Sequence, residues 1–257
     1  MSKPNPDGAV DASGELLPEL SKSSNKMKMA RLLNTPAPSF AGKTPGSRFW
    51  TWVAFTLARR VRAIQFKTSH VSGYENIPDD RGVLFSAWHT NGLIDALAIM
   101  LPNPKYFVIG GRHDMVTRPI LGCWTRKLAV QPVVRKAELL RGGCSEEEAT
   151  FLNGKTLLSL STGISRGFGC VLFPEGTSHD ESHMVRFRTG PMRTVLAAAA
   201  ISIAEDNPLP VILPVGLHYR VRHYFRTDHW LEFGKPIIIE KSDIPQQLVE
   251  AVKQGNW

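Results

Sequence analysis

The sequence predicts an α/β domain with a mostly parallel central sheet flanked by helices. Short apolar runs typical of buried strands alternate along the chain with longer segments typical of helices, and this alternation favours parallel strands. The chain has 257 residues, of which 42% are hydrophobic, enough for one sizeable core without disulfides. The same composition excludes a fully disordered chain, and no apolar run reaches the ~20 residues that span a bilayer.

Residues 1–47 are expected to form a tail ahead of the first element. Proline and serine are frequent in this stretch, both charge signs occur, and aromatic residues are few. Such a composition cannot bury enough apolar surface to order itself. The uninterrupted apolar segment of a secretory signal is also missing. We therefore interpret these residues as a spacer.

Residues 48–70 are expected to form an amphipathic helix at a membrane interface. Ser47 can cap this helix, and four apolar residues then fall on one helical face: Phe49, Trp52, Val53 and Leu57. The stretch 49–67 carries four basic residues and no acidic one. Aromatic residues beside basic ones suit a helix that lies in the plane of a membrane surface. The alternative is a helix packed on the core with a solvated basic end.

Residues 71–257 are expected to form the domain itself. Strands are expected at residues 83–87, 106–109, 130–134, 171–173, 211–217 and 230–233, with residues 237–239 extending the last one. Helices are expected at residues 93–101, at 145–164 with a break at Gly154, and at 190–204. Ser145 and Glu148 give the second helix a capping-box start, and Pro208 and Pro210 end the third.

His89 closes one predicted strand and Asp95 lies in the first turn of the next helix. Open α/β sheets place ligands at the carboxyl ends of their strands. A carboxylate that reaches Nδ1 of an imidazole fixes its tautomer and stabilises the imidazolium, which suits a general base acting on a hydroxyl. Six positions of separation require a turn between the two residues, and Asn91 and Gly92 can supply it. The alternative is a histidine and an aspartate with unrelated roles.

The segment Phe173–Asp180 follows another predicted strand and resembles a phosphate-binding loop. Gly176 permits close backbone approach, and the Thr177 hydroxyl can donate a hydrogen bond. Three arginines follow within twenty residues and can form charge-assisted bonds to a phosphate: Arg186, Arg188 and Arg193. The alternative is a surface turn beside a solvated basic face.

Two further patterns are discounted. His179 and His183 are spaced as i and i+4, but no third ligand is spaced to complete a metal site, so we expect no metal. The run Gly163–Gly167 matches the G-x-S-x-G pattern of serine hydrolases, with Ser165 as the serine. The nucleophile elbow needs a strand before it and a helix after it. Here the predicted order is reversed.

The motifs together resemble the glycerolipid acyltransferase family, the PlsC-like phospholipid/glycerol acyltransferases. The run His89–Asp95 is similar to that family's first motif, with a spacer of five residues where four is commoner. The segment 173–180 matches the third motif of the fungal glycerol-3-phosphate acyltransferase branch, and Ser178 stands where the commoner family form has arginine. Two more segments resemble the second and fourth motifs: Arg118–Gly122 with Gln131–Arg135, and Val211–Gly216.

This resemblance implies a mechanism, substrates and site residues. It implies that His89 is the general base and that Asp95 orients it. It implies an acceptor-binding group of six residues: Arg135, Glu175, Gly176, Thr177, Arg188 and Arg193. The implied reaction moves a fatty acyl group from an acyl thioester, acyl-CoA or acyl-carrier protein, to a hydroxyl of glycerol-3-phosphate or lysophosphatidate, without a cofactor. Another lysophospholipid or lipid acceptor is the alternative.

The net charge of +8 narrows the expected partners. Such an excess permits nucleic-acid binding, a function of a different class. However, no RNA- or DNA-binding motif occurs, and the basic residues gather near the predicted phosphate loop and in the amphipathic segment. We therefore expect a phosphorylated acceptor and a membrane surface as partners, and no nucleic acid. The expected location is peripheral or monotopic, on the cytoplasmic face of a membrane.

Overall fold

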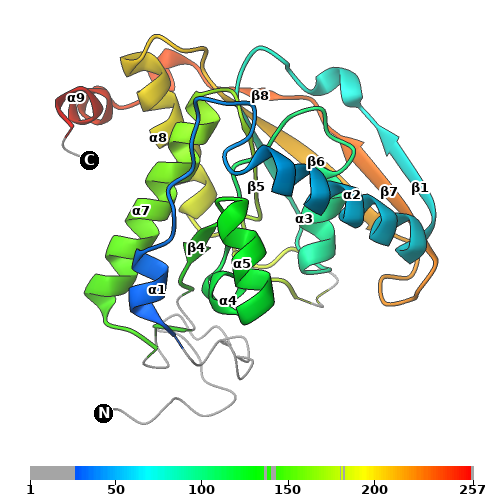
Figure 1. Ribbon diagram of the computed structural model, residues 1–257. Coiled ribbons are helices and arrows are strands. Elements are labelled where there is room, and N and C mark those ends of the chain that lie inside the picture. The colour runs from blue at the N-terminus through cyan, green and yellow to red at the C-terminus, as the bar shows by residue number, and fades with distance from the viewer. Residues whose placement is uncertain (1–26, 136–137, 140–142, 180, 182, 256–257) are drawn as a thin grey trace.

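The computed structural model describes residues 27–135, 138–139, 143–179, 181 and 183–255 (Figure 1). The helices are α1 (Met29–Leu33), α2 (Arg48–Gln65), η1 (Tyr74–Asn76), α3 (Leu93–Met100), α4 (His113–Thr117), α5 (Pro119–Lys127), α7 (Glu146–Ser165), α8 (Gly190–Ala204), η2 (Lys241–Asp243) and α9 (Gln246–Gln254). The strands are β1 (Phe66–Ser72), β2 (Val83–Ala87), β3 (Gly110–Arg112), β4 (Gln131–Val133), β5 (Gly169–Leu172), β6 (Val211–Tyr219), β7 (Thr227–Phe233) and β8 (Ile237–Ile238).

A six-stranded sheet forms the centre, in the order β1-β7-β6-β2-β5 with β8 paired to β6. Strand β2 is parallel to both β5 and β6, and β1 is parallel to β7. The pairs β6–β7 and β6–β8 are antiparallel. The expected α/β fold with a mainly parallel sheet is therefore confirmed. Strands β3 and β4 form a separate parallel pair.

Different helices cover the two faces of the sheet (Figure 1). On one face Leu84 and Cys170 pack against Ile164 of α7 and the alanines of α8, and α9 packs on α8. On the other face Phe85 packs with Ile99 of α3. Strand β2 is thus buried from both sides, which accounts for its almost continuous apolar sequence. This buried strand ends two residues before His89.

Residues 27–47 pack on the domain instead of forming the expected spacer. Leu32 of α1 is fully buried, and it belongs to a small apolar cluster with Val116, Val130 and Leu152. The Gln131 amide also donates a hydrogen bond to the Pro36 carbonyl, at 3.0 Å. The difference arises because the partners of Leu32 come from α4, α7 and the β4 region, which local composition does not report. Residues 1–26 of the expected tail lie outside the described residues.

The amphipathic segment is a helix only as far as Gln65. The Ser47 hydroxyl caps it by accepting a hydrogen bond from Trp50 N at 3.4 Å. At Phe66 the chain turns into β1, which pairs with β7, so the sheet begins before the expected boundary at residue 71. The expected segment 48–70 therefore contains most of an edge strand as well as a helix.

Helix α2 carries five of its apolar side chains outward. All 18 of its residues are described, and none is fully buried. Phe55 packs against the core on the face of α3, and Trp50 contacts Trp124 at 5.4 Å between ring centroids. Five apolar side chains are between 49% and 63% exposed: Phe49, Trp52, Leu57, Val61 and Ile64. Among the described residues no helix is long and apolar enough to cross a membrane.

Three expected elements differ in detail. Helix α7 is continuous through Gly154, because an exposed glycine inside a helix costs only about 1 kcal/mol. Residues 237–238 do not extend β7 but form β8, antiparallel to β6. The expected strand at 106–109 is reduced to one bridge between Phe107 and Gly169.

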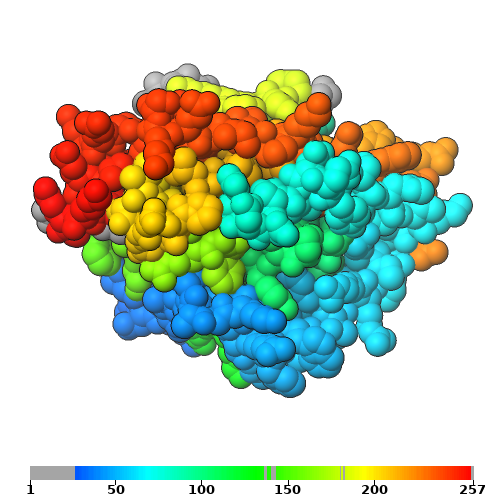
Figure 2. Space-filling model, turned by 90° about the horizontal axis from the view of Figure 1, so that it is seen from above, coloured from blue at the N-terminus to red at the C-terminus, as the bar shows by residue number. Residues whose placement is uncertain are grey.

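The two regions that the sequence links to anionic partners lie far apart. Figure 2 shows the blue N-terminal segment and α2 along one edge of the molecule, and the yellow-green segment that follows β5 along the opposite edge. The predicted phosphate loop and the amphipathic helix therefore present their arginines on separate surfaces.

Candidate active site

The fold brings His89 and Asp95 into direct contact. Strand β2 ends at Ala87, and Gly92 precedes α3 with a φ of +49°, a backbone conformation that favours glycine. The turn expected at Asn91–Gly92 is thus present. It folds the start of α3 back onto the strand end, so that His89 Nδ1 lies 3.0 Å from Asp95 Oδ2.

The Asp95 carboxylate is fully buried and fully engaged. Besides the His89 ring, Oδ2 accepts hydrogen bonds from the backbone amides of Thr90, at 2.8 Å, and Asn91, at 2.7 Å. Its other oxygen, Oδ1, accepts one from the Tyr219 hydroxyl at 2.7 Å. A buried carboxylate is costly unless it is bonded in this way. The arrangement therefore holds a negative charge in a fixed position behind the imidazole.

The imidazole of His89 is held from its face as well as from its edge. Its ring stacks on Phe173 with centroids 3.7 Å apart and planes within 7°. Because Nδ1 faces the carboxylate, the proton lies on Nδ1 and the lone pair lies on Nε2. The side chain is 17% exposed, so an incoming hydroxyl can reach this ring. Chemically, the pair can take a proton from an alcohol.

Glu175 ties the loop after β5 to the end of β2. It is 2% exposed. Its Oε2 accepts a hydrogen bond from His89 N at 2.9 Å, and its Oε1 accepts one from Val185 N at 3.1 Å and lies 2.9 Å from His179 Nε2. Glu175 was expected in the acceptor-binding group. In the structure its oxygens are occupied by the protein, so it positions the loop.

The remaining residues of the predicted phosphate loop lie near the surface. Gly176 has a φ of +70°, and a side chain there would approach Arg188 Cγ to 3.3 Å. Thr177 is half-buried, whereas Arg188 and Arg193 are exposed, the latter in the first turn of α8. The loop therefore combines backbone that only glycine adopts readily with cationic side chains open to solvent, as an anion site requires.

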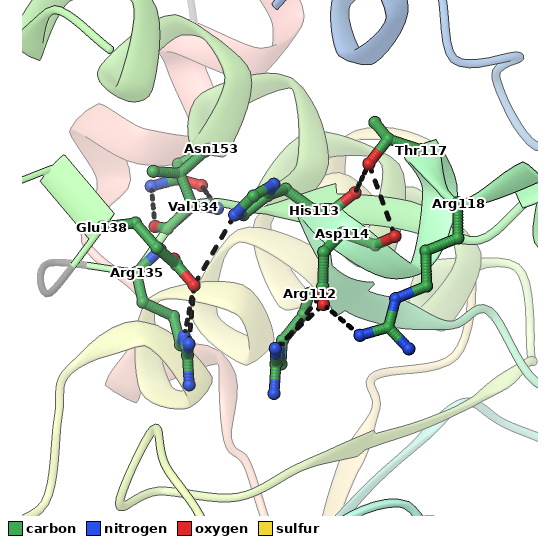
Figure 3. Close-up of polar contacts among 9 residues, drawn as sticks. All are labelled: Arg112, His113, Asp114, Thr117, Arg118, Val134, Arg135, Glu138 and Asn153. Atoms are coloured by element: carbon green, nitrogen blue, oxygen red, sulfur yellow. Dashed lines mark hydrogen bonds and ion pairs between the residues drawn. The ribbon is translucent and has the colours of Figure 1, made fainter. Parts of the chain in front are cut away.

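Arg135 lies in a different setting (Figure 3). Its guanidinium donates to Glu138 Oε1 from Nε at 2.9 Å and from Nη2 at 2.6 Å. Arg112 and Arg118 both donate to the buried Asp114 carboxylate. Figure 3 shows the guanidinium groups of the three arginines on the same side of the cluster that they form with Asp114 and Glu138. Arg135 is thus a carboxylate-supported cation, and it is not joined by a described contact to the loop after β5.

Sequence reasoning did not select Tyr219 or Arg112. It named Arg118 within the second motif, but not the ion pair of Arg118 with Asp114. Tyr219 lies 124 positions from Asp95, so no local spacing signals their contact. Both Arg112 and Arg118 pair with Asp114, at two and four positions. The i,i+4 spacing of Asp114 and Arg118 could have indicated the second pair.

The two discounted patterns have structural roles or none. Ser165 ends α7 and is 3% exposed, and its hydroxyl has no hydrogen-bond partner among the described residues. It lies on a helix, not on a nucleophile elbow. His179 contacts Glu175, and no group of three potential metal ligands converges within the described part of the chain.

The fold and this site define an α/β domain whose histidine–aspartate pair can deprotonate a hydroxyl. The sequence profile of the family described as "Acyltransferase" matches residues 68–218, more than half of the chain, including His89, Asp95 and Glu175. The chain belongs to this acyltransferase family.

Similar segments occur in yeast proteins. The chain is 38% identical over 73 residues to glycerol-3-phosphate O-acyltransferase 2 of Saccharomyces cerevisiae, which covers 28% of this chain and 9% of that protein. It is 34% identical over 83 residues to glycerol-3-phosphate O-acyltransferase 1 of the same yeast, covering 31% and 10%. An uncharacterised acyltransferase of Schizosaccharomyces pombe is 36% identical over 90 residues, 35% and 12%. The matches thus span about a tenth of each yeast protein.

A solved structure has the same fold. The 1-acyl-sn-glycerophosphate (LPA) acyltransferase PlsC of Thermotoga maritima superposes with a TM-score of 0.52 at 17% sequence identity. The superposition covers 80% of this chain and 77% of that one. At this identity the likeness concerns the arrangement of the chain only.

Proposed function

We propose that this chain is an O-acyltransferase that moves a fatty acyl group from an acyl thioester to a hydroxyl of glycerol-3-phosphate or lysophosphatidate. The observation that carries the proposal is the contact between His89 Nδ1 and the buried Asp95 carboxylate, at 3.0 Å. Family membership and the names of the yeast relatives support the same reaction class. Both acceptors remain candidates, as does another lysophospholipid.

His89 supplies the base in this reaction. Its Nε2 accepts the acceptor's hydroxyl proton while that oxygen attacks the thioester carbonyl carbon. The C–O bond forms, the C–S bond breaks, and the proton passes from the imidazolium to the departing thiolate. Asp95 stabilises the imidazolium between these steps. The route needs no enzyme nucleophile, cofactor or metal.

An apolar groove lined by Trp88, the residue before His89, suits the acyl donor. The groove has a volume of about 520 Å³ and runs along β6 from the end of β2. Its lining includes Trp88, Met184, Phe187, Pro214, Leu217 and Ile237. Glu175, which binds the His89 amide, also lines it. A fatty chain in this groove would bury apolar surface while its thioester lies close to the imidazole.

The exposed cations of the loop after β5 suit the acceptor phosphate. Arg188 lies on the segment that Glu175 ties to His89, and Arg193 lies in the first turn of α8, which follows that segment. A phosphate bound there would hold the acceptor hydroxyl close to the imidazole, which replaces a bimolecular encounter by an oriented one. Gly176 and Thr177 complete this proposed subsite. Arg135 would contribute to it from the cluster of Figure 3.

The outward apolar residues of α2 suit a membrane surface. Trp52 and Val61 are 63% and 60% exposed, and arginines flank them on a helix without acidic residues. Such a helix binds anionic lipid by burying its apolar face and pairing its cations with headgroups. We therefore propose peripheral or monotopic attachment at the cytoplasmic face. Nucleic acid has no such apolar surface to offer.

An acceptor panel tests the proposed function. The protein is incubated with labelled acyl-CoA or acyl-carrier protein and anionic vesicles, and with glycerol-3-phosphate, lysophosphatidate or another lysophospholipid. We expect a labelled ester with one of the phosphorylated glycerol acceptors, and none with His89→Ala. Product formation with no acceptor of the panel would contradict the proposal.

A matched substitution controls for nonspecific effects. His70→Ala removes an exposed histidine on the edge strand β1, and it should retain full transfer. Retention on DNA without binding to vesicles would favour the nucleic-acid alternative instead.

A further inference from the structure

Asp95 has a second side-chain partner beyond His89. Its Oδ2 accepts hydrogen bonds from His89 Nδ1 and from two backbone amides. Its Oδ1 accepts one hydrogen bond among the described residues, from the Tyr219 hydroxyl at 2.7 Å. The two oxygens are therefore distinguished by their partners. A rotation of the carboxylate about Cβ–Cγ would break the bond to Tyr219 and redistribute the other three.

The sheet register delivers Tyr219 to this place. Strand β6 runs parallel to β2, with Val215 opposite Ala87 at the end of β2. It then continues for four residues and ends at Tyr219, which overhangs the turn between β2 and α3. The position is thus determined by the strand length, not by a flexible loop.

Aromatic neighbours hold the Tyr219 ring. The ring stacks on Phe66 at 5.8 Å between centroids and lies 5.1 Å from the His229 ring. Burial, together with the nearby Asp95 charge, raises the pKa of the Tyr219 phenol. The phenol therefore stays protonated at neutral pH and can only be the donor in its bond to the carboxylate.

We propose that Tyr219 is a positioning residue for the His89–Asp95 pair. Its hydroxyl fixes the rotation of the Asp95 carboxylate and so maintains the Nδ1–H tautomer of His89, with the Nε2 lone pair toward the acceptor. The inference rests on the proposed function only for its effect on catalysis. Its effect on the imidazole is independent of any substrate.

Tyr219→Phe tests this inference because it keeps the packed ring and removes only the hydroxyl. We expect kcat to fall about tenfold, the loss typical of one hydrogen bond to a charged group, with KM unchanged for both substrates. The acid limb of the kcat/KM profile should move to higher pH, since the carboxylate charge is no longer shared with the phenol. Tyr74→Phe, at a 45% exposed tyrosine, should behave like the wild type.

A double substitution separates positioning from folding. In an Asp95→Asn background the further change Tyr219→Phe should alter kcat by less than about twofold, because the two residues act through one contact. A tenfold loss in both backgrounds would overturn the proposal, as would an unchanged kcat and pH profile in Tyr219→Phe itself. Thermal unfolding of each variant reports any loss of fold.

A spectroscopic measurement keeps the proposal testable if no acyl transfer is found. Long-range ¹H–¹⁵N correlations from the ring protons distinguish the two histidine tautomers, and the His89 signals are assigned by their loss in His89→Ala. We expect one Nδ1–H tautomer in the wild type and in Tyr74→Phe, and a mixture in Tyr219→Phe. The same single tautomer in Tyr219→Phe would overturn the inference, whereas inactivity of the wild type would contradict only the proposed function.

Discussion

The His89–Asp95 site and helix α2 differ in how far the protein itself buries and contacts their side chains. At the site a buried carboxylate receives four hydrogen bonds and a stacked ring fixes the imidazole. On α2 no residue is fully buried and five large apolar side chains face outward. The site is therefore organised before any substrate binds. Helix α2, in contrast, has an apolar face that only a partner can cover.

The largest effect is expected when the imidazole is removed from the His89–Asp95 site. In His89→Ala we expect kcat to fall by about 10²- to 10⁴-fold, the range of a lost general base. The fold should persist, because the buried carboxylate keeps its other three donors. Steady-state kinetics and thermal unfolding check both parts. Turnover within about tenfold of wild type would contradict the assigned role.

Acid should weaken the same region through His229, which lies behind Tyr219 and is 1% exposed. Burial lowers the pKa of His229 to about 4, with the Arg62 charge acting in the same direction and Asp95 opposing it. In the unfolded chain His229 is protonated near pH 6.5, whereas in the folded protein it stays neutral down to a lower pH. Above pH 6.5 both states are neutral, so this group then costs the fold no stability. As the pH falls from 6.5 toward 4, the free energy of unfolding should decrease by about 3 kcal/mol.

Urea unfolding at a series of pH values measures this loss. The variant His229→Gln cannot take up the proton, so its free energy of unfolding should depend less steeply on pH between about 6.5 and 4. Identical slopes for the variant and the wild type would exclude His229 as the source.

At the other end of the comparison, removing the outer apolar face of α2 should weaken membrane attachment. For the triple change of Trp52, Leu57 and Val61 to Ser we expect vesicle binding about 10- to 100-fold weaker, from the apolar area no longer buried. Activity on a water-soluble acceptor should be retained. Flotation with anionic vesicles measures the effect. Ile120→Ser with Phe151→Ser, at exposed apolar residues elsewhere, is the control, and equal losses would refute a specific surface on α2.

The smallest effect is expected at Arg193, which is exposed in the first turn of α8. In Arg193→Ala the KM for the phosphorylated acceptor should rise about tenfold, the value of one charge-assisted hydrogen bond, while kcat changes little. Initial rates over a range of acceptor concentrations give both constants. Arg166→Ala removes an arginine paired with Glu205 elsewhere and should leave KM unchanged. An unaltered KM in Arg193→Ala would remove this residue from the subsite.

The sequence predicted the site most successfully where the chemistry is local. Only seven positions contain His89, Gly92 and Asp95, so the strand end, the turn and the nearby carboxylate could be predicted from one short segment. The alternation of strands and helices likewise predicted the sheet, because burial from both faces leaves an apolar run. The same reasoning gave residues 190–204 as a helix with the bounds that α8 has.

What the sequence did not predict depends on contacts between distant segments. Tyr219 meets Asp95 only because β6 lies beside β2, and strand pairing has no local signature. Leu32 is buried by residues about a hundred positions away, so its neighbours suggested a tail. Residues 237–238 pair with β6 for the same reason, although they directly follow β7 in sequence.

The pairing of β2 on both sides has a consequence for the opening motions of this domain. Both edges of β2 are paired, with β5 and with β6, and both of its faces are covered. Its paired amide protons exchange only when β5 or β6 separates from it, so they should be among the last to exchange. The amides of α2, on a helix without a buried residue, should exchange through local fraying. His89 therefore follows a strand that should be among the last to open, whereas α2 should open locally.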